Sequence, residues 1–287
     1  MKKNRLAFWG FVGPAVFAFT LIVVIPLLFG IYYSFTDWNG ISSNITLIGF
    51  ENYMEVFKDK GFLKSFIFTT KFTIASVITI NIIGFSLALL VTRELKMSNI
   101  LRTVFFMPNL IGGLILGFIW QFIFTKAFAA LGEATGATWL LGWLSNTETG
   151  FWGLVILMSW QMSGYLMIIY IAALQNIPQE LIEASRIDGA NAWQRVKHIV
   201  FPLVRPAFTV SLFLTLSNSF KLYDQNLSLT GGGPANSTQM LAMNIYNTAF
   251  KFNNMGVAQA KAVIFFLVIG GITLSQVYIT KKGEVEM

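Results

Sequence analysis

Long apolar runs separated by short charged segments form the main pattern of this chain. Six of these runs come close to the roughly 20 residues that a helix needs to cross a lipid bilayer. The fifth run reaches that length only if it includes Lys221, whose long side chain can carry its charge toward the membrane surface. The pattern therefore predicts six transmembrane helices, over residues 6–35, 66–91, 103–125, 151–175, 203–223 and 260–280.

Composition supports this prediction and narrows the class of protein. Of the 287 residues, 55% are hydrophobic and only 11% are charged, whereas soluble domains carry about 25% charged residues. So few charges cannot cover the water-facing surface of a chain this long, and the high hydrophobicity excludes intrinsic disorder. We therefore expect an all-α polytopic membrane protein with a single transmembrane domain over residues 1–287.

The basic residues predict how the helices are oriented. Six helices place both termini on one side, and cytoplasmic loops are enriched in Lys and Arg. Twelve of the 20 basic residues fall on the side of the termini: Lys2, Lys3, Arg5, Arg93, Lys96, Arg102, Arg186, Arg195, Lys197, Arg205, Lys281 and Lys282. We therefore expect both termini in the cytoplasm. The first apolar run is far longer than the roughly 7–15 residues of a signal-peptide core, so we expect it to be retained as a helix.

Several kinds of chemistry are excluded by what the sequence lacks. It has no cysteine and a single histidine, His198, which leaves no disulfide, no thiol nucleophile and no normal zinc ligand set. It has no P-loop motif, so the chain cannot hydrolyse ATP in that way. The net charge of +7 does not indicate nucleic-acid binding, because the basic residues occur in small groups between apolar runs. We expect no cofactor and no metal.

Neutral polar and aromatic side chains inside the predicted spans suggest a polar path. Amides, hydroxyls and aromatic faces suit a neutral polyhydroxyl solute, although each such group could instead form hydrogen bonds between helices. Only Lys221 and Asp224 are ionisable candidates within the spans, and they could simply pair with each other. The candidate substrate path consists of Trp120, Gln121, Trp160, Gln161, Tyr165, Asn218, Tyr223 and Asp224.

The loop over residues 176–202 differs from the other loops. Pro178 suits the first turn of a helix, and Gly189 suits its end. A second short helix is expected from about Ala190 to His198, before Pro202. The sequence therefore predicts a rigid helix–Gly–helix projection on the cytoplasmic side.

Residues of this loop carry a resemblance to a known family. Glu183-Ala184-Ser185, followed by Gly189, Ile199 and Pro202, resembles the "EAA" signature of the inner-membrane permease subunits of ABC importers. That pattern is E-A-A, three residues, G, nine residues and I-x-L-P, and the spacing agrees throughout. Ser185 replaces the second Ala, and Phe201 replaces Leu. The resemblance implies that the coupling residues toward an ATPase are Glu183, Ala184, Ser185, Asp188, Gly189, Ile199 and Pro202.

Other segments resemble the carbohydrate branch of these importers. They are residues 34–37 with 49–53, residues 102–108 with 119–120, residues 187–190, and residues 229–234. The Gly-rich last segment is similar to the permease half related to the maltose F and glycerol-phosphate A subunits. From its residues alone, this segment is either a turn that faces a partner or solute, or only a turn between helices.

The resemblance implies a fold and a set of partners. It implies the type I ABC importer transmembrane fold with a cytoplasmic coupling helix, in a bacterial cell membrane. The partners would be a second homologous permease subunit, a cytoplasmic ATPase dimer and an extracytoplasmic sugar-binding protein. Glu183 would pair with a basic group on the ATPase or within the loop. Disaccharides, raffinose-type oligosaccharides and glycerol phosphate all remain open as solutes.

Two other functions remain as alternatives. A secondary sugar carrier that works without an ATPase would need coupling charges at the membrane midplane and an internal repeat. A membrane-embedded enzyme that acts on lipid-linked sugars would need catalytic carboxylates or a metal site near an interface. Neither set of features is evident in the sequence.

Overall fold

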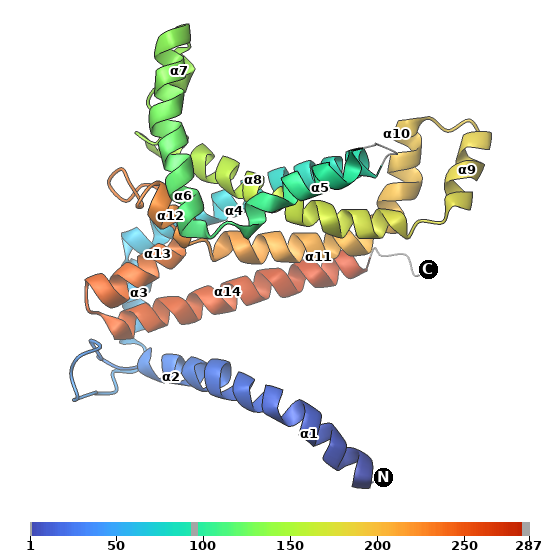
Figure 1. The fold of residues 1–287 in the computed structure, drawn as a ribbon. Helices are drawn as coiled ribbons and strands as arrows, with labels where there is room; N and C mark the ends of the chain where they lie inside the picture. Colours follow the sequence, from blue (N-terminus) through green and yellow to red (C-terminus); the bar gives the residue numbers. More distant parts are fainter. Residues whose placement is uncertain (1, 93–96, 283–287) are drawn as a thin grey trace. The chain divides into compact units, whose positions relative to one another are not determined.

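The computed structural model describes residues 2–92 and 97–282, and Figure 1 shows that their regular structure is helical. Six helices are long and apolar enough to cross a membrane, which confirms the predicted number. Arg93 and Lys96, two of the residues used to predict orientation, lie outside the described residues. The six candidate spans are Phe8–Tyr33, Lys60–Val91, Gly113–Thr135, Thr147–Gln175, Ala192–Phe220 and Met255–Lys281.

The helices follow one another with several π and 3-10 turns between them. The α-helices are α1 (Lys2–Phe19), α2 (Ile25–Tyr33), α3 (Glu51–Lys58), α4 (Lys60–Val91), α5 (Ser98–Phe106), α6 (Gly113–Phe122), α7 (Phe128–Thr135), α8 (Thr147–Gln175), α9 (Gln179–Ile187), α10 (Ala192–Arg195), α11 (Phe201–Phe220), α12 (Asp224–Leu229), α13 (Leu241–Tyr246) and α14 (Met255–Lys281). They divide into two compact units: Met1–Phe62 with Asn244–Val268, and Leu63–Met243 with Ile269–Met287. The expectation of one permease domain stays a prediction.

In the first unit, the segment after α2 is held by the side chain of Asn52. Its Nδ2 donates to the carbonyl oxygens of Ser34 and Thr36 at 2.9 and 2.8 Å. Gly256, in the first turn of α14, packs on the same segment, because an added Cβ there would lie 2.3 Å from the Thr36 carbonyl oxygen. A side chain larger than hydrogen would therefore separate α14 from this segment.

The first unit also contains a buried charge that falls inside the predicted span over residues 260–280. Lys261 lies in α14, which begins at Met255, five residues before the predicted start. Its Nζ lies 2.7 Å from Oδ2 of Asp59 and donates to Asn244 Oδ1 and Thr248 Oγ1 at 3.0 and 2.8 Å. The expectation that Lys221 and Asp224 are the only ionisable groups in the spans is therefore wrong. The buried charge of Lys261 is tolerated because its ammonium group has three polar partners, one of which is a carboxylate.

In the second unit, α8 forms the centre and packs against α5, α6, α11 and α12. Of its most apolar stretch, 72% is buried, and Leu154, Leu157, Leu166 and Tyr170 are fully covered. Because lipid chains are as apolar as leucine, close packing and hydrogen bonds stabilise such contacts more than removal from water does. Gly164 permits the closest approach, since an added Cβ would lie 1.8 Å from the Phe105 carbonyl oxygen of α5.

A buried hydrogen-bond chain joins three helices of the second unit. The Tyr170 hydroxyl of α8 donates to Asn81 Oδ1 of α4 at 2.6 Å. Asn81 Nδ2 in turn donates to the Thr215 hydroxyl of α11 at 3.2 Å. Hydrogen bonds of this kind between membrane helices contribute about 0.6–2 kcal/mol each, so they fix which faces of α4, α8 and α11 meet.

The third span differs from the prediction of residues 103–125. α5 ends at Phe106, a 3-10 turn covers Met107–Leu110, and the span begins only at Gly113. Pro108 lacks the N–H that would continue the helix, and its ring opposes the carbonyl four residues earlier. The helix then runs past Lys126 to Thr135, so both predicted ends are wrong.

The fifth span also differs from the prediction of residues 203–223. Helix runs without a break from Ala192 to Phe220, so the expected separate helix over residues 190–198 is wrong. A π turn over Val196–Val200 precedes Pro202. The wider π turn accommodates the ring of Pro202 and its missing N–H. From the sequence alone, this proline predicts the end of a helix.

Candidate functional site

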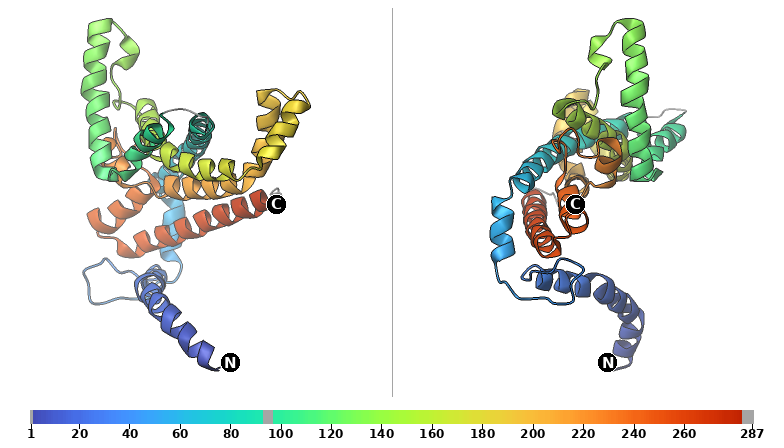
Figure 2. Two further views of the ribbon diagram at one scale, coloured as in Figure 1. Left: turned by 45° about the vertical axis from the view of Figure 1, so that its right-hand side comes forward. Right: turned by 90° about the vertical axis from the view of Figure 1, so that its left-hand side faces the viewer.

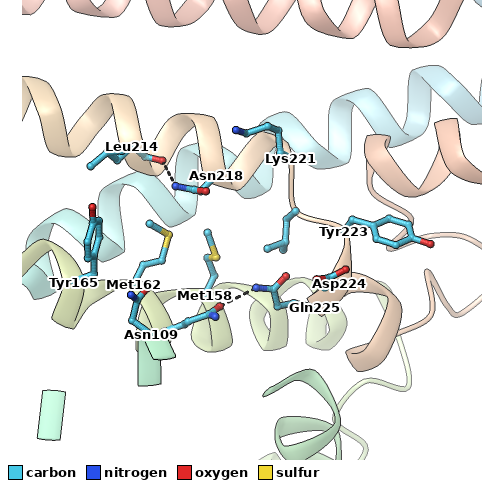
Figure 3. A pocket seen from close by; sticks show the side chains of 12 residues that line it. Asn109, Met158, Met162, Tyr165, Leu214, Asn218, Lys221, Tyr223, Asp224 and Gln225 are labelled. Atoms are coloured by element: carbon cyan, nitrogen blue, oxygen red, sulfur yellow. Dashed lines mark hydrogen bonds between the residues drawn. The ribbon is translucent and has the colours of Figure 1, made fainter. Parts of the chain in front are cut away.

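A cavity of about 430 Å³ lies in the second unit, between α8, α11, α12 and the break that follows α5. Figure 3 shows amide, hydroxyl, thioether and aromatic side chains around it. Its lining residues are Asn109, Met158, Gln161, Met162, Tyr165, Leu214, Asn218, Lys221, Leu222, Tyr223, Asp224 and Gln225.

The structure brings five of the eight predicted path residues to this cavity. These are Gln161, Tyr165, Asn218, Tyr223 and Asp224. They come from three separate stretches of sequence, at the middle of α8, the end of α11 and the start of α12. That they contact a solute stays a prediction.

The other three predicted path residues do not line the cavity. Trp120 of α6 packs edge-on against Trp160 of α8, with ring centroids 5.6 Å apart. The Nε1 of Trp120 is buried and has no hydrogen-bond partner among the described residues. Gln121 donates its Nε2 to the Leu229 carbonyl oxygen at 3.1 Å and so joins α6 to α12. These side chains serve helix packing in this structure.

One wall of the cavity is a chain of amide hydrogen bonds. Gln225 Nε2 of α12 donates to Gln161 Oε1 of α8 at 2.8 Å. Gln161 Nε2 donates to the carbonyl oxygen of Ile111 at 3.3 Å. Ile111 lies in the helix break, where backbone groups are not consumed by helical hydrogen bonds. The wall therefore offers donors and acceptors that could exchange these partners for solute hydroxyls.

The cavity contains one basic and one acidic side chain, Lys221 and Asp224. Their side chains form no ion pair with each other, so the pairing considered for them is wrong in this structure. Figure 3 shows them on opposite sides of the cavity. An arrangement of dispersed opposite charges and many neutral groups suits a polar, uncharged ligand.

Sequence reasoning missed Asn109 and Gln225. Asn109 follows Pro108 at the break between α5 and α6, and Gly112-Gly113 ends that break. A hydrophobic segment interrupted by Gly and Pro is the signal that could have located it, because such segments form binding sites in transporters. Gln225 lies in a polar stretch just beyond the fifth predicted span, where no pattern indicates that α12 folds back toward α8.

α9 is a short helix with a capped C-terminus in the loop over residues 176–202. Gly189 has φ +77°, and its N–H donates to the Arg186 carbonyl oxygen at 3.1 Å. The next N–H, of Ala190, donates to the Ser185 carbonyl oxygen at 2.9 Å. This pair of bonds is a Schellman cap, in which the left-handed position favours glycine. Asn191 and Gln194 then form a capping box that starts α10.

α9 and α10 stand side by side in the views of Figures 1 and 2. Several of their large apolar side chains are exposed. Leu181, Ile187 and Trp193 are 45%, 87% and 72% exposed. A second cavity, of about 350 Å³, lies at the turn after α9 and beside α10 and the π turn, and is lined by Asp188, Gly189, Ala190, Gln194, His198 and Ile199.

The seven predicted coupling residues lie on α9, in the turn that follows it, and in the segment that leads into α11. Glu183, Ala184 and Asp188 are exposed on α9 and at its end, and Ser185 is buried. Ile199 and Pro202 are half-buried and lie in the π turn and at the start of α11. The Glu183 carboxylate forms no ion pair within the part of the chain that the structure describes, which leaves it available to a partner.

The Gly-rich segment over residues 229–234 is built around Asn226. The Asn226 side chain is fully buried. It donates to Thr238 O at 2.9 Å and to Thr230 Oγ1 at 3.0 Å, and it accepts from Met240 N at 3.0 Å. Gly231 and Gly232 both have positive φ in this turn. These contacts account for the segment as a turn between helices.

No group of three or more metal-binding side chains occurs within residues 2–92 and 97–282.

Comparison with known proteins places this chain in a family. Residues 80–282 match the family described as "Binding-protein-dependent transport system inner membrane component". The "Probable starch degradation products transport system permease protein AmyD" of Thermoanaerobacterium thermosulfurigenes is 58% identical over 99% of this chain and 97% of that protein. The "Multiple sugar-binding transport system permease protein MsmF" of Streptococcus mutans is 31% identical over 98% of each.

Solved structures confirm the fold. A bacterial ABC transporter "involved in the import of the acidic polysaccharide alginate" matches with a TM-score of 0.85, over 98% of this chain and 96% of that one, at 18% identity. The expected all-α, six-helix fold of an ABC importer transmembrane subunit is therefore confirmed. The chain belongs to the family of binding-protein-dependent transport system inner membrane components.

Proposed function

We propose that this chain is one permease subunit of an ATP-driven importer, that it forms half of the path for a sugar or oligosaccharide, and that α9 couples it to a separate ATPase. The observation that carries the proposal is that α8 and the continuous α10–α11 helix both connect the exposed loop to the neutral cavity. A rigid helix can transmit a displacement along its whole length, so movement of the loop would reach the cavity walls.

The partners follow from the same features. An ATPase dimer in the cytoplasm would receive α9, where Leu181 and Ile187 supply apolar contact and Glu183 supplies a charge. A homologous permease subunit would complete the path as a heterodimer. A binding protein would deliver the solute on the outer side, as the family's description and a solved alginate importer bound to its "periplasmic protein" suggest. The distribution of basic residues supports placing both termini in the cytoplasm of a bacterial cell.

Malto-oligosaccharides are the solutes we favour. The AmyD relative carries a name for starch degradation products, and those products are neutral glucose chains. The cavity volume of about 430 Å³ falls within the roughly 300–1,000 Å³ of ligand pockets in general. Its amides suit sugar hydroxyls, and Tyr165 and Tyr223 offer flat faces for sugar rings.

The pair of Lys261 and Asp59 does not favour a secondary carrier, although it places a charge in a span. A proton relay needs a group that can change its charge during transport. Here each charge is neutralised by the other at 2.7 Å, and Lys261 donates to two further side-chain oxygens.

Transport in reconstituted vesicles tests the proposal. The chain, its partner permease and the ATPase are reconstituted in lipid vesicles with ATP inside and the binding protein outside. Uptake of labelled maltotriose into the vesicles is then measured. We expect uptake that requires ATP hydrolysis and that is competed by unlabelled maltotriose. Uptake by the permease subunits without the ATPase would contradict the proposal and would favour the carrier.

A further inference from the structure

α3 is a short helix outside the spans, and its side chains fall on three faces. Successive residues of an α-helix are rotated by about 100°, since one turn takes 3.6 residues. Asn52 and Val56 form one face and are buried in the first unit, with 4% and 0% exposure. Glu51, Glu55 and Lys58 are exposed on a second face. A helix that only connected two spans would need a buried face and a water-facing face, but no exposed apolar face.

The third face is an apolar stripe. It consists of Phe50, Met54 and Phe57, spaced at i, i+4 and i+7, and these side chains are 69%, 55% and 64% exposed. Residues at this spacing lie along one side of a helix. Three large apolar side chains in one uncovered row mark a surface that contacts something other than water.

α3 lies where two membrane spans end. Asn52 of α3 binds the carbonyl oxygens of Ser34 and Thr36, and Ser34 directly follows Tyr33, the last residue of the first span. An added Cβ at Gly256, in the first turn of the sixth span, would lie 2.9 Å from Asn52 Nδ2. The level at which these spans end is the membrane surface, so α3 lies at that level.

Two lysines beside the stripe are complementary to the phosphates of lipid headgroups, whereas Glu51 and Glu55 lie farther around the helix from it. Lys58 ends α3, Lys60 begins α4, and both are exposed. A helix with one apolar face, one charged face and lysines at its border has the character of a helix that lies in the plane of the membrane interface. Lysines in this position attract anionic phosphates.

We propose that α3 lies in the membrane–water interface, with Phe50, Met54 and Phe57 among the lipid acyl chains and with Lys58 and Lys60 on phosphate headgroups. The occupant of the stripe is therefore lipid. This role is separate from solute transport: it fixes the depth of the segment between the first two spans, which is anchored to α14 through Asp59 and Lys261.

The absence of cysteine from the chain allows a direct test. Single Met54→Cys and Glu55→Cys variants carry a fluorescent nitrobenzoxadiazole probe on adjacent, exposed positions of two different faces. The complete importer is reconstituted in phosphatidylcholine vesicles containing phosphatidylglycerol. We expect lipids with doxyl-labelled acyl chains to quench the Met54 probe at least about threefold more than the Glu55 probe, because the two side chains point about 100° apart around the helix and only the Met54 probe lies on the stripe. Iodide in water should show the reverse order.

Each other result overturns the proposal. Equal quenching of both probes by iodide would mean that the stripe faces water. Protection of the Met54 probe from both quenchers would mean that protein covers the stripe. If that protection appeared only when the extracytoplasmic binding protein is added, the stripe would be a docking face for that protein.

The lysines are tested in the same vesicles. Lys58→Gln combined with Lys60→Gln should reduce doxyl quenching of the Met54 probe at least about twofold when phosphatidylglycerol is present, because each basic residue near an anionic surface adds several-fold to its attraction. In phosphatidylcholine alone, the same pair of substitutions should change little. An equal effect in both lipids would show that the lysines do not bind the anionic headgroups.

Discussion

Asp59 is a single carboxylate that serves two helices. Its Oδ1 accepts from the backbone N–H groups of Gly61 and Phe62 at 2.7 and 3.2 Å, which satisfies donors at the start of α4. Its Oδ2 lies 2.7 Å from Lys261 of α14. Because taking a charge out of water costs several kcal/mol, a buried lysine without this partner would be strongly unfavourable.

Substitution of Asp59 by Asn separates these two tasks. Asn can still accept from the N–H groups of Gly61 and Phe62, but it leaves the Lys261 charge uncompensated. We expect Asp59→Asn to lower the free energy of unfolding by about 3 kcal/mol, measured as loss of thermal stability of the purified subunit. Adding Lys261→Met should restore most of the loss. If the double variant were no more stable than the single one, the ion pair would not be the cause. Lys60→Met, at an exposed lysine, is the matched control.

The same carboxyl predicts a pH dependence. Burial alone would raise the pKa of Asp59, but the hydrogen bond from Lys261, the N–H groups of Phe62 and Gly61 and the Lys261 charge together hold it below its usual 3.8. A depressed pKa in the folded state stabilises the protein above the unfolded pKa, and this contribution disappears as the pH falls through the folded value. Thermal stability should therefore fall steeply below about pH 4, and Asp59→Asn should remove that part of the fall. An identical acid profile in both proteins would assign the loss to other groups.

At the scale of helices, the contact between α5 and α8 depends on the missing side chain of Gly164. A Cβ would meet backbone atoms of Phe105, which cannot rotate away as a side chain would. We expect Gly164→Ala to destabilise the protein by about 1–3 kcal/mol, read from its melting temperature. Gly270→Ala is the control, because no atom lies within 4 Å of its added Cβ and alanine favours helix. Equal melting temperatures for the two variants would contradict this packing.

A charge-free run of residues was sufficient to predict the number of helices, but not where they break. Charges mark where a chain leaves the lipid, and this located α8 to within a few residues at its start. Pro108 and Pro202 have similar local sequence signals, yet the first ends α5 and the second lies inside a continuous helix. A 3-10 turn contains Pro108, whereas a π turn before Pro202 lets the helix continue. The local sequence signal does not distinguish these two turns.

The cavity shows the same limit for side chains. Gln161 was predicted because an amide inside a span suits a polar path. Gln225 was not, because it lies after α11, in a polar stretch typical of a loop. Only the folding of α12 against α6, where Gly113 and Gly117 permit close approach to Gln225 and Ser228, brings Gln225 to Gln161.

Gly189 tests whether the shape of the loop matters for ATPase binding. No neighbour would contact a Cβ at this position, so a substitution acts only through φ +77°. We expect Gly189→Val to cost about 1–2 kcal/mol locally and to reduce co-purification of the ATPase. Asn tolerates this conformation, so Gly189→Asn should retain most of the ATPase. Equal recovery with both variants would show that the cap is not required for assembly.

At the scale of the second unit, two helices join the loop to the cavity. α8 carries Gln161 and ends at Gln175, just before α9. The helix from Ala192 to Phe220 carries Asn218 at its other end. With a rise of about 1.5 Å per residue, these rods extend roughly 20 and 40 Å from loop to cavity. A substitution in the loop is therefore too far from the cavity to contact its lining residues, and the reverse is also true.

Substitutions at the loop and at the cavity should cause different defects. Glu183→Arg reverses an exposed charge on α9 that has no partner within the described chain, so the subunit should fold and reach the membrane but lose ATPase binding and uptake together.

Gln161→Leu removes hydrogen bonds to Gln225 and Ile111, so the ATPase should still bind while uptake of maltotriose falls at least about tenfold, the effect of one lost polar contact of about 1.4 kcal/mol. ATPase co-purification and vesicle uptake, measured on both variants, separate the two defects. A substitution at either end could also disturb folding of the whole subunit. Leu181→Ala on α9 and Asn109→Ala at the cavity therefore serve as milder variants of the two ends. If Gln161→Leu lost the ATPase, or if Glu183→Arg transported normally, the loop and the cavity would not have the separate roles that their positions on these helices indicate.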